Sequence, residues 1–88
     1  MLTPEFTTQF KRDYKLSDKR GLDMSLIDTI IDDLINEQPL SEKYRDHPLK
    51  GEYIGCRECH VQSDWLLVYR IVGEDIVFAR NGTHSDLF

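Results

Sequence analysis

The sequence lacks the marks of an exported or membrane-bound protein. No apolar run approaches the roughly 20 residues that a membrane-spanning helix needs, and no basic and then apolar stretch opens the chain as a secretion signal would. We therefore expect a cytoplasmic location and no membrane partner. The chain is also short, because its 88 residues with 40% hydrophobic content suffice for only one small core. A single domain over residues 1–88 is the expectation.

Cysteine is scarce as well. Cys56 and Cys59 are the only two, and with His60 they match the C-x-x-C-H pattern of c-type haem attachment. Haem of that kind is attached to exported proteins, and residues three apart on a strand point to opposite faces. A structural zinc site needs four ligands, and the chain has no second cysteine pair. We expect two reduced thiols, with no haem, no metal and no other cofactor.

Basic residues are outnumbered, with 11 Lys and Arg against 16 Asp and Glu, for a net charge of −5. Residues 1–22 nevertheless contain five bases and three acids, whereas residues 23–37 contain five acids and no base. The acidity is thus concentrated in one segment. The net charge weakens the case for a nucleic-acid partner, but a locally basic face elsewhere is compatible with one.

Apolar periodicity predicts two helices in the first half of the chain. Aromatic residues recur every four positions in residues 6–16, and Gly21 closes that segment. Asp23 suits the N-cap of a second helix, which we expect Pro39 to stop. The apolar stripe of this second helix has three-four spacing and comprises Met24, Ile27, Ile30, Ile31, Leu34 and Ile35.

The second half predicts a sheet. Three strands are expected, near residues 52–59, 65–72 and 76–81. Residues 1–4 form at most an edge strand, residues 39–51 a structured loop and residues 82–88 a tail. Two helices followed by an antiparallel meander indicate an α+β fold, with both helices packed on one face of the sheet.

The turn signal at residues 73–75 brings chemically versatile side chains together. Folding a hairpin about it makes paired residue numbers sum to about 147 or 148, which places Asp64 across from Thr83 or His84. Two histidines, a carboxylate and an arginine then converge at one open end of the sheet: His60, Asp64, Arg80 and His84. This set combines acid–base groups with an anion binder.

Three stretches of the second half resemble a known family. They are residues 44–51, 57–69 and 80–88, and they are similar to the YafQ branch of the RelE toxin superfamily. The likeness runs through essentially the whole chain. It implies the toxin of a type II toxin–antitoxin system, with two N-terminal helices on a mainly antiparallel twisted sheet. Many relatives are basic, so this acidic chain departs from them and has less electrostatic help in reaching ribosomal RNA.

The resemblance also implies an activity and partners. The activity is that of an mRNA interferase, a ribosome-dependent and metal-independent endoribonuclease that cuts translated mRNA in the ribosomal A site. The partners are the ribosome, mRNA and a cognate antitoxin that wraps the toxin and blocks its active site. The toxin–antitoxin complex is expected to bind operator DNA through the antitoxin. A non-catalytic relative such as the gyrase-binding ParE toxins is the alternative, which the presence of all four converging residues disfavours.

The functional positions implied by the resemblance are all present. The catalytic set is His47, His60, Asp64, Arg80 and His84, and the substrate-binding set is Lys50, Trp65 and Phe88. We expect His84 to act as general acid and His60 as base or substrate positioner, because histidine titrates near neutral pH. Asp64 would orient an imidazole and Arg80 would stabilise the phosphorane.

Each of these residues also has a structural alternative. His84 could be a solvated tail residue, His60 a surface or core histidine, and Asp64 a turn residue. His47 could fix its loop beside a proline, and Arg80 could form an ion pair with a carboxylate. Trp65 is expected in the core more than in a contact, and Phe88 could cap the core or stack on a base.

Overall fold

A five-stranded sheet runs through the centre of the protein in the computed structural model, which describes residues 1–88. Its strands are β1 (Thr3–Phe6), β2 (His47–Pro48), β3 (Arg57–Gln62), β4 (Trp65–Val72) and β5 (Asp75–Gly82). Their spatial order is β1-β5-β4-β3-β2, and only the edge pair β1–β5 is parallel. The predicted α+β class and the mainly antiparallel sheet are confirmed.

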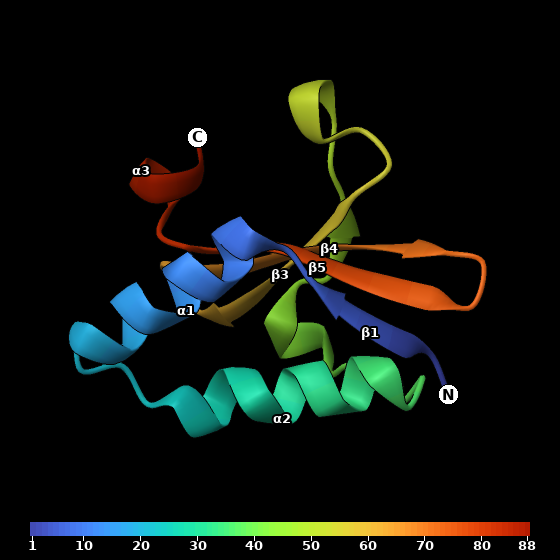
Figure 1. The fold of residues 1–88 in the computed structure, drawn as a ribbon, viewed down its shortest axis with the longest axis horizontal. Coiled ribbons are helices and arrows are strands. Elements are labelled where there is room, and N and C mark those ends of the chain that lie inside the picture. The colour runs from blue at the N-terminus through green and yellow to red at the C-terminus, as the bar shows by residue number, and fades with distance from the viewer.

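Helices lie on both sides of this sheet. The α-helices are α1 (Thr8–Lys19), α2 (Met24–Ile35) and α3 (His84–Leu87), and two 3-10 turns are η1 (Glu42–Tyr44) and η2 (Gly51–Tyr53). Figure 1 shows the sheet nearly edge-on, with α2 below it and α3 and the η2 segment above it. None of the helices combines the length and the apolar character needed to span a membrane.

The first two helices begin where side chains cap them. The Thr7 hydroxyl accepts from the Phe10 N–H and the Asp23 carboxylate accepts from the Ser25 N–H, each satisfying an otherwise free donor of the first turn. The Asp23 cap was predicted, but α1 begins two residues later than expected. The attribution of the end of α2 to Pro39 is wrong, because the helix ends at Ile35 and Glu37 already adopts a left-handed φ of 57°.

The face of the sheet under α1 and α2, here called the helix-covered face, holds the main core of 13 buried residues. Phe10 of α1 and Ile27 and Ile30 of α2 supply its helical side. Trp65, Leu67, Tyr69, Ile76 and Phe78 supply its sheet side. The packing of both long helices on one sheet face is thus confirmed. Alternate residues of the strands point to the opposite side, here called the second face, where Leu66, Val68 and Leu87 form a core of only three buried residues.

The sequence-based assignment of the elements bordering the second face needs three corrections. The strand expected at 52–59 begins only at Arg57, because η2 and a turn at Gly55 with φ 89° precede it. The loop expected at 39–51 contains the short strand β2. The tail is a capped helix, since the Thr83 hydroxyl accepts from the Asp86 N–H while the Asp86 carboxylate accepts from the Thr83 N–H.

The β4–β5 hairpin contains both registers considered from the sequence. Val68 pairs with Arg80 and Tyr69 pairs with Phe78, so Ala79 is an extra residue that forms a bulge. A one-residue shift in register moves a side chain to the other face of a sheet. The bulge at Ala79 therefore turns Arg80 away from the helix-covered face and onto the second face.

Candidate active site

Residues that pair across neighbouring strands place a row of mostly polar side chains on the second face. His47 of β2 pairs with Glu58 of β3. Glu58 faces Val68 of β4, which in turn faces Arg80 of β5. Directly opposed residues of neighbouring strands point the same way, and so do residues two apart on one strand, which adds His60. Side chains from four strands thus meet on one surface.

The three histidines form a continuous line across this surface. The ring centroids of His47 and His60 are 6.2 Å apart, and those of His60 and His84 are also 6.2 Å apart. The Phe88 ring continues the line at 6.1 Å from His84. The predicted proximity of His60 and His84 is confirmed. His47, from the loop that was expected before the sheet, lies next to them.

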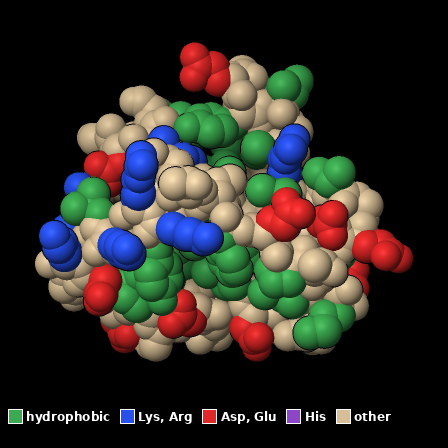
Figure 2. Space-filling model, in the orientation of Figure 1, with side chains coloured by type: hydrophobic (Ala, Val, Ile, Leu, Met, Phe, Trp, Pro, Cys, Tyr) green, Lys and Arg blue, Asp and Glu red, His purple; other side chains and the backbone are tan.

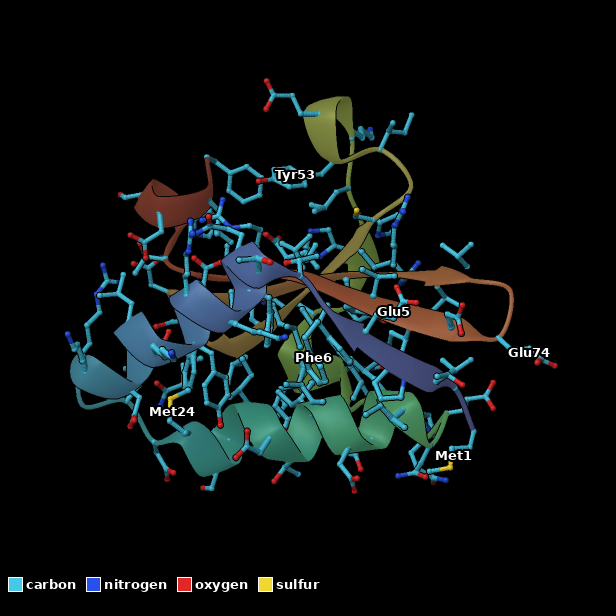
Figure 3. All side chains as sticks on the ribbon, in the orientation of Figure 1. Met1, Glu5, Phe6, Met24, Tyr53 and Glu74 are labelled. Atoms are coloured by element: carbon cyan, nitrogen blue, oxygen red, sulfur yellow. The ribbon has the colours of Figure 1, made fainter.

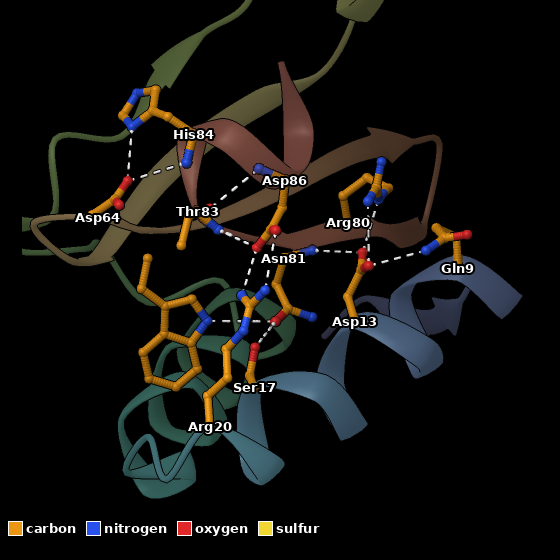
Figure 4. A network of polar contacts seen from close by, with 11 residues as sticks. Gln9, Asp13, Ser17, Arg20, Asp64, Arg80, Asn81, Thr83, His84 and Asp86 are labelled. Carbon is orange, nitrogen blue, oxygen red and sulfur yellow. Dashed lines mark hydrogen bonds and ion pairs between the residues drawn. The ribbon is translucent and has the colours of Figure 1, made fainter.

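His84 is held by Asp64 through two hydrogen bonds, which Figure 4 shows. Asp64 Oδ1 accepts from the His84 backbone N–H at 3.1 Å and lies 3.2 Å from His84 Nδ1. These bonds, the backbone one first, lower the pKa of the Asp64 carboxyl. Because the carboxylate can only accept, the proton of this pair lies on Nδ1, and Nε2 is left for a substrate.

The helix that carries His84 is anchored to α1. Arg20 donates from both terminal nitrogens to Asp86, at 2.7 and 3.2 Å. This bidentate pair, with the Thr83 N–H as the next contribution, holds the pKa of the Asp86 carboxyl well below its usual range. Leu87 is buried against the second face. Arg20 and Leu87 together fix where His84 can lie.

Glu58 is a member of the site that the sequence interpretation missed. Only 4% of it is exposed, and its Oε2 lies 3.1 Å from His47 Nε2 and 3.8 Å from His60 Nε2. Its other oxygen, Oε1, is buried without any hydrogen-bond partner. A buried carboxylate is costly unless a cation accompanies it. Strand periodicity could have placed Glu58 on the same face as His60, two residues later, although it could not have shown that Glu58 is buried.

Arg80 is tied to α1 by an ion pair. Its Nε and Nη2 donate to the carboxylate of Asp13 at 2.8 and 3.2 Å, as drawn in Figure 4. Asp13 is buried and also accepts from the backbone N–H of Asn81 and from the side chain of Gln9. The ion-pair alternative for Arg80 is therefore present in the structure, and it fixes the guanidinium on the second face.

The three substrate-binding candidates differ in exposure. Trp65 is 2% exposed and its indole N–H donates to Asn81 Oδ1, which agrees with the expectation that it lies in the core more than in a contact, and its role in substrate binding stays a prediction. Phe88 is 61% exposed, with its ring edge-on to Tyr53 at 5.4 Å. In Figure 3 the Tyr53 side chain projects from the η2 segment toward α3. Lys50 is exposed at the start of η2.

Basic residues border the site despite the net charge. A cleft of about 470 Å³ opens beside His60, and Lys43, Tyr44 and Arg45 line it. Leu26 of α2 also lines this cleft, so the acidic helix and the two basic residues border the same opening.

His47, Glu58 and His60 could hold a metal ion, because one ligand atom from each lies within 4.8 Å of the others. The thiols do not join them. Cys59 is buried in the core of the helix-covered face, whereas Cys56, which precedes β3, packs against the second face. Burial raises the pKa of the Cys59 thiol to about 12.

Comparisons with known proteins agree with this geometry. The family model for "Bacterial toxin of type II toxin-antitoxin system, YafQ" matches residues 2–88. The mRNA interferase toxin YafQ of Escherichia coli K12 is 41% identical over 85 residues, which are 96% of this chain and 92% of that protein.

Solved structures of bacterial toxins share this fold. YafQ in the E. coli DinJ-YafQ complex has a TM-score of 0.93 and 39% identity, covering 100% of this chain and 99% of that one. A metal-bound toxin from Helicobacter pylori has a TM-score of 0.93 and 44% identity, covering both chains completely. The chain belongs to the YafQ family of bacterial toxins from type II toxin–antitoxin systems.

Proposed function

We propose that this protein is an mRNA interferase, a toxin that cuts translated mRNA by acid–base catalysis on the second face of its sheet. The observation that carries the proposal is the Asp64–His84 pair, with His60 at 6.2 Å from the His84 ring. Arg80, fixed by Asp13, supplies a positive charge on the same face. These are the groups that metal-independent RNA cleavage requires.

The reaction moves two protons. A base takes the proton of a ribose 2′-hydroxyl, and the 2′-oxygen attacks the adjacent phosphorus. The bond between phosphorus and the 5′-oxygen breaks as an acid protonates that oxygen. The products are a 2′,3′-cyclic phosphate and a free 5′-hydroxyl. No electron is gained or lost, so no redox cofactor is needed.

The site offers a group for each role. His84 serves as the acid through Nε2, since Asp64 holds Nδ1–H and stabilises the charged imidazole. His60, or Glu58 beside it, serves as the base, and both are held by the same strand. His47 holds Glu58 in place and adds positive charge when protonated. Arg80 stabilises the negative charge on the crowded phosphate.

Exposed residues around this centre suit a single-stranded RNA. Phe88, standing beside His84, offers a ring on which a base can stack. Lys43, Arg45 and Lys50 provide charge for the backbone. Because the substrate is mRNA under translation, we expect cleavage in the ribosomal A site and a cytoplasmic location, with residues 1–88 acting as one domain.

A groove on the other side of the molecule suits the antitoxin. It has a volume of about 540 Å³ and lies between α1 and α2. Its apolar floor includes Phe6, which Figure 3 shows between the two helices. Lysines of α1 border one side and aspartates of α2 the other: Lys11, Lys15, Asp28 and Asp32. Figure 2 shows this arrangement, with blue side chains above a green area and red ones below.

An amphipathic antitoxin segment fits that groove. Apolar side chains would cover its floor, with acids facing the lysines and bases facing the aspartates. A second antitoxin segment would cover the histidine line, and the complex would bind operator DNA through the antitoxin. Lys11→Glu combined with Lys15→Glu should weaken antitoxin binding at least about tenfold, which corresponds to roughly 1.4 kcal/mol. Lys19→Glu, outside the groove, is the control, and unchanged affinity in the double variant argues against this docking site.

Induction of the chain in bacteria tests the function. Growth should stop, and mapped mRNA ends should fall within translated reading frames. Purified ribosomes programmed with mRNA should show the same cuts, while naked mRNA should not. Growth arrest with intact mRNA and inhibited gyrase would refute the proposal in favour of a non-catalytic toxin.

A further inference from the structure

We propose that the cleft beside His60 binds the nucleotide on the 5′ side of the cut, and that polar side chains of the cleft select the base of that nucleotide. The inference rests on the proposed function, because it assigns one subsite of the same reaction. The cleft has a volume of about 470 Å³ and is lined by Leu26 and by residues 43–45 and 60–63. Small-molecule sites have volumes of about 300–1,000 Å³, so the cleft has room for one nucleotide.

The order of the histidines gives the direction of the RNA. The proposed base, His60, lines the cleft, whereas the proposed acid, His84, does not. The base takes the proton of a 2′-hydroxyl, which belongs to the nucleotide on the 5′ side of the cut. The acid protonates the 5′-oxygen of the next nucleotide. The ribose that carries the attacking oxygen therefore lies at the His60 end of the line, and its base lies nearest the cleft.

The cleft has two positive charges that are free to bind a phosphate. Lys43 and Arg45 are exposed, and neither forms an ion pair with a carboxylate. Lys43 Nζ lies 5.0 Å from the centroid of the Tyr44 ring, which holds the ammonium at the cleft. No acid is among the lining residues, to which the acidic helix α2 contributes only Leu26. The cleft itself thus attracts the RNA backbone although the chain is acidic.

Two polar side chains of the cleft are available to recognise a base. Gln62 ends β3 and Ser63 begins the turn into β4, and both are exposed without a side-chain hydrogen bond to the rest of the chain. An amide and a hydroxyl can each donate and accept. Sequence-specific RNA recognition relies on such hydrogen bonds to the edges of unstacked bases. The next residue is Asp64, which holds His84, so base recognition and the acid share one turn.

The walls of the cleft are fixed relative to the histidine line. Tyr44 packs against the main core, and Val61 is part of it. The Arg45 carbonyl accepts from His47 Nδ1 at 2.6 Å, with Arg45 in a left-handed conformation of φ 51°. A nucleotide in the cleft is therefore held at a set position from the histidines. The lining has only three apolar side chains, which favours a nucleotide over an antitoxin segment that docks by apolar burial.

Photocrosslinking locates the nucleotide without requiring cleavage. The full chain is bound to ribosomes programmed with an mRNA that has a 2′-deoxy nucleotide before the mapped cut, so no 2′-hydroxyl can attack. A photoreactive analogue of the base on the 5′ side of the cut should crosslink to residues 43–45 or 60–63. The same analogue on the 3′ side should not. Crosslinking of the 3′ base to the cleft, or no crosslink of the 5′ base there, overturns the subsite.

Substitutions of the polar pair test the selection of the base. Gln62→Ala and Ser63→Ala should each reduce the preference for the base on the 5′ side of the cut by roughly two- to twelvefold, as one lost hydrogen bond does. The preference on the 3′ side should stay as in the wild type. Cleavage of ribosomes programmed with all four bases at each position measures both preferences. An unchanged 5′ preference in both variants overturns the selection.

Substitutions of the two bases test the phosphate contact. Lys43→Gln combined with Arg45→Gln should raise the KM for programmed ribosomes at least about fivefold and change kcat less than about twofold. Lys43→Arg combined with Arg45→Lys should recover most of the affinity. Lys19→Gln combined with Arg70→Gln is the matched control, because it removes the same charge at exposed positions outside the cleft. A KM no higher than that of the control overturns the contact.

Thermal melts show which variants fold, and the subsite is judged on those that do. Weaker antitoxin binding with unchanged cleavage in the cleft variants assigns the cleft to the antitoxin and overturns the proposal. If the wild-type chain cuts no RNA, the proposed function fails. Crosslinking to the uncleavable mRNA still decides in that case which nucleotide lies in the cleft.

Discussion

The two faces of the sheet differ in what they contribute, since one holds most of the hydrophobic core and the other carries the candidate active site. The helix-covered face holds 13 buried core residues, whereas the core of the second face holds three. On the second face the space is taken by ionisable groups, including Glu58, which is buried with an unpaired oxygen. A small protein can place such groups at a surface because the opposite face supplies most of the hydrophobic stabilisation.

The faces are joined at one edge by a polar network. Asp13 of α1 binds both the Arg80 side chain and the Asn81 backbone. Asn81 Oδ1 accepts from Ser17 and lies 3.4 Å from the Trp65 indole nitrogen, as Figure 4 shows. Arg80 is therefore both an element of the candidate site and an element of the fold. Substitutions on one face should change either stability or catalysis alone, whereas substitutions in this polar network should change both.

The largest effect is expected from the second face. His84→Gln removes the proposed acid and should lower the rate of mRNA cleavage by about 10² to 10³. Its ring is exposed and its backbone bond to Asp64 remains, so the melting temperature should be unchanged. Cleavage by programmed ribosomes and circular dichroism melts measure the two quantities. Ser85→Ala, at the exposed neighbouring residue, is the control. Full activity in His84→Gln would show that the second face is not where catalysis takes place.

The helix-covered face should give the reverse result. Ile30 is 1% exposed, so Ile30→Ala should lower the free energy of unfolding by about 2–5 kcal/mol through lost burial and a cavity. The protein that remains folded should cleave at the normal rate per molecule. Urea unfolding with a parallel activity assay tests this. Leu26→Ala, at a position 37% exposed, is the matched control and should cost much less.

Arg80→Ala should affect both properties. It removes positive charge from the site and leaves buried Asp13 without its ion pair, which we expect to destabilise the fold by roughly 1–3 kcal/mol. Asp13→Asn in the same chain should restore part of the stability and none of the activity. If Arg80→Ala melts at the same temperature as the wild type, the Asp13–Arg80 ion pair contributes little to the stability of the fold.

The two faces also differ in how far the sequence could predict them. Apolar spacing identified the α2 stripe and the hairpin, because burial against a sheet leaves a periodic pattern. No pattern reports that Glu58 is buried, since a strand carboxylate normally faces water. The two residues of β2 are too few for any period, and the Ala79 bulge depends on packing. The Asp13–Arg80 pair joins residues 67 apart in the sequence, and no local pattern predicts which carboxylate Arg80 will pair with.

The smallest effect concerns the anchor between the faces, Arg20–Asp86. The Arg20 hydrogen bond depresses the pKa of Asp86 in the folded protein. A carboxyl with a depressed pKa contributes stability above its unfolded pKa of about 3.9, and that contribution disappears as the pH falls below that value. The α3 helix should therefore loosen in acid before the helix-covered core does. Because the pair is partly exposed, the effect on global stability should be slight.

Amide exchange of Leu87, compared with Leu67 in the main core, measures this local loosening. Protection of Leu87 should fall on acidification while protection of Leu67 persists. Arg20→Gln should lower Leu87 protection already at neutral pH and should move its acid loss to higher pH, because the Asp86 pKa then lies nearer its ordinary value. Lys19→Gln, one residue earlier and outside the pair, is the control. Equal protection of Leu87 in Arg20→Gln and the wild type at every pH would mean that Leu87 burial alone positions His84 on the second face.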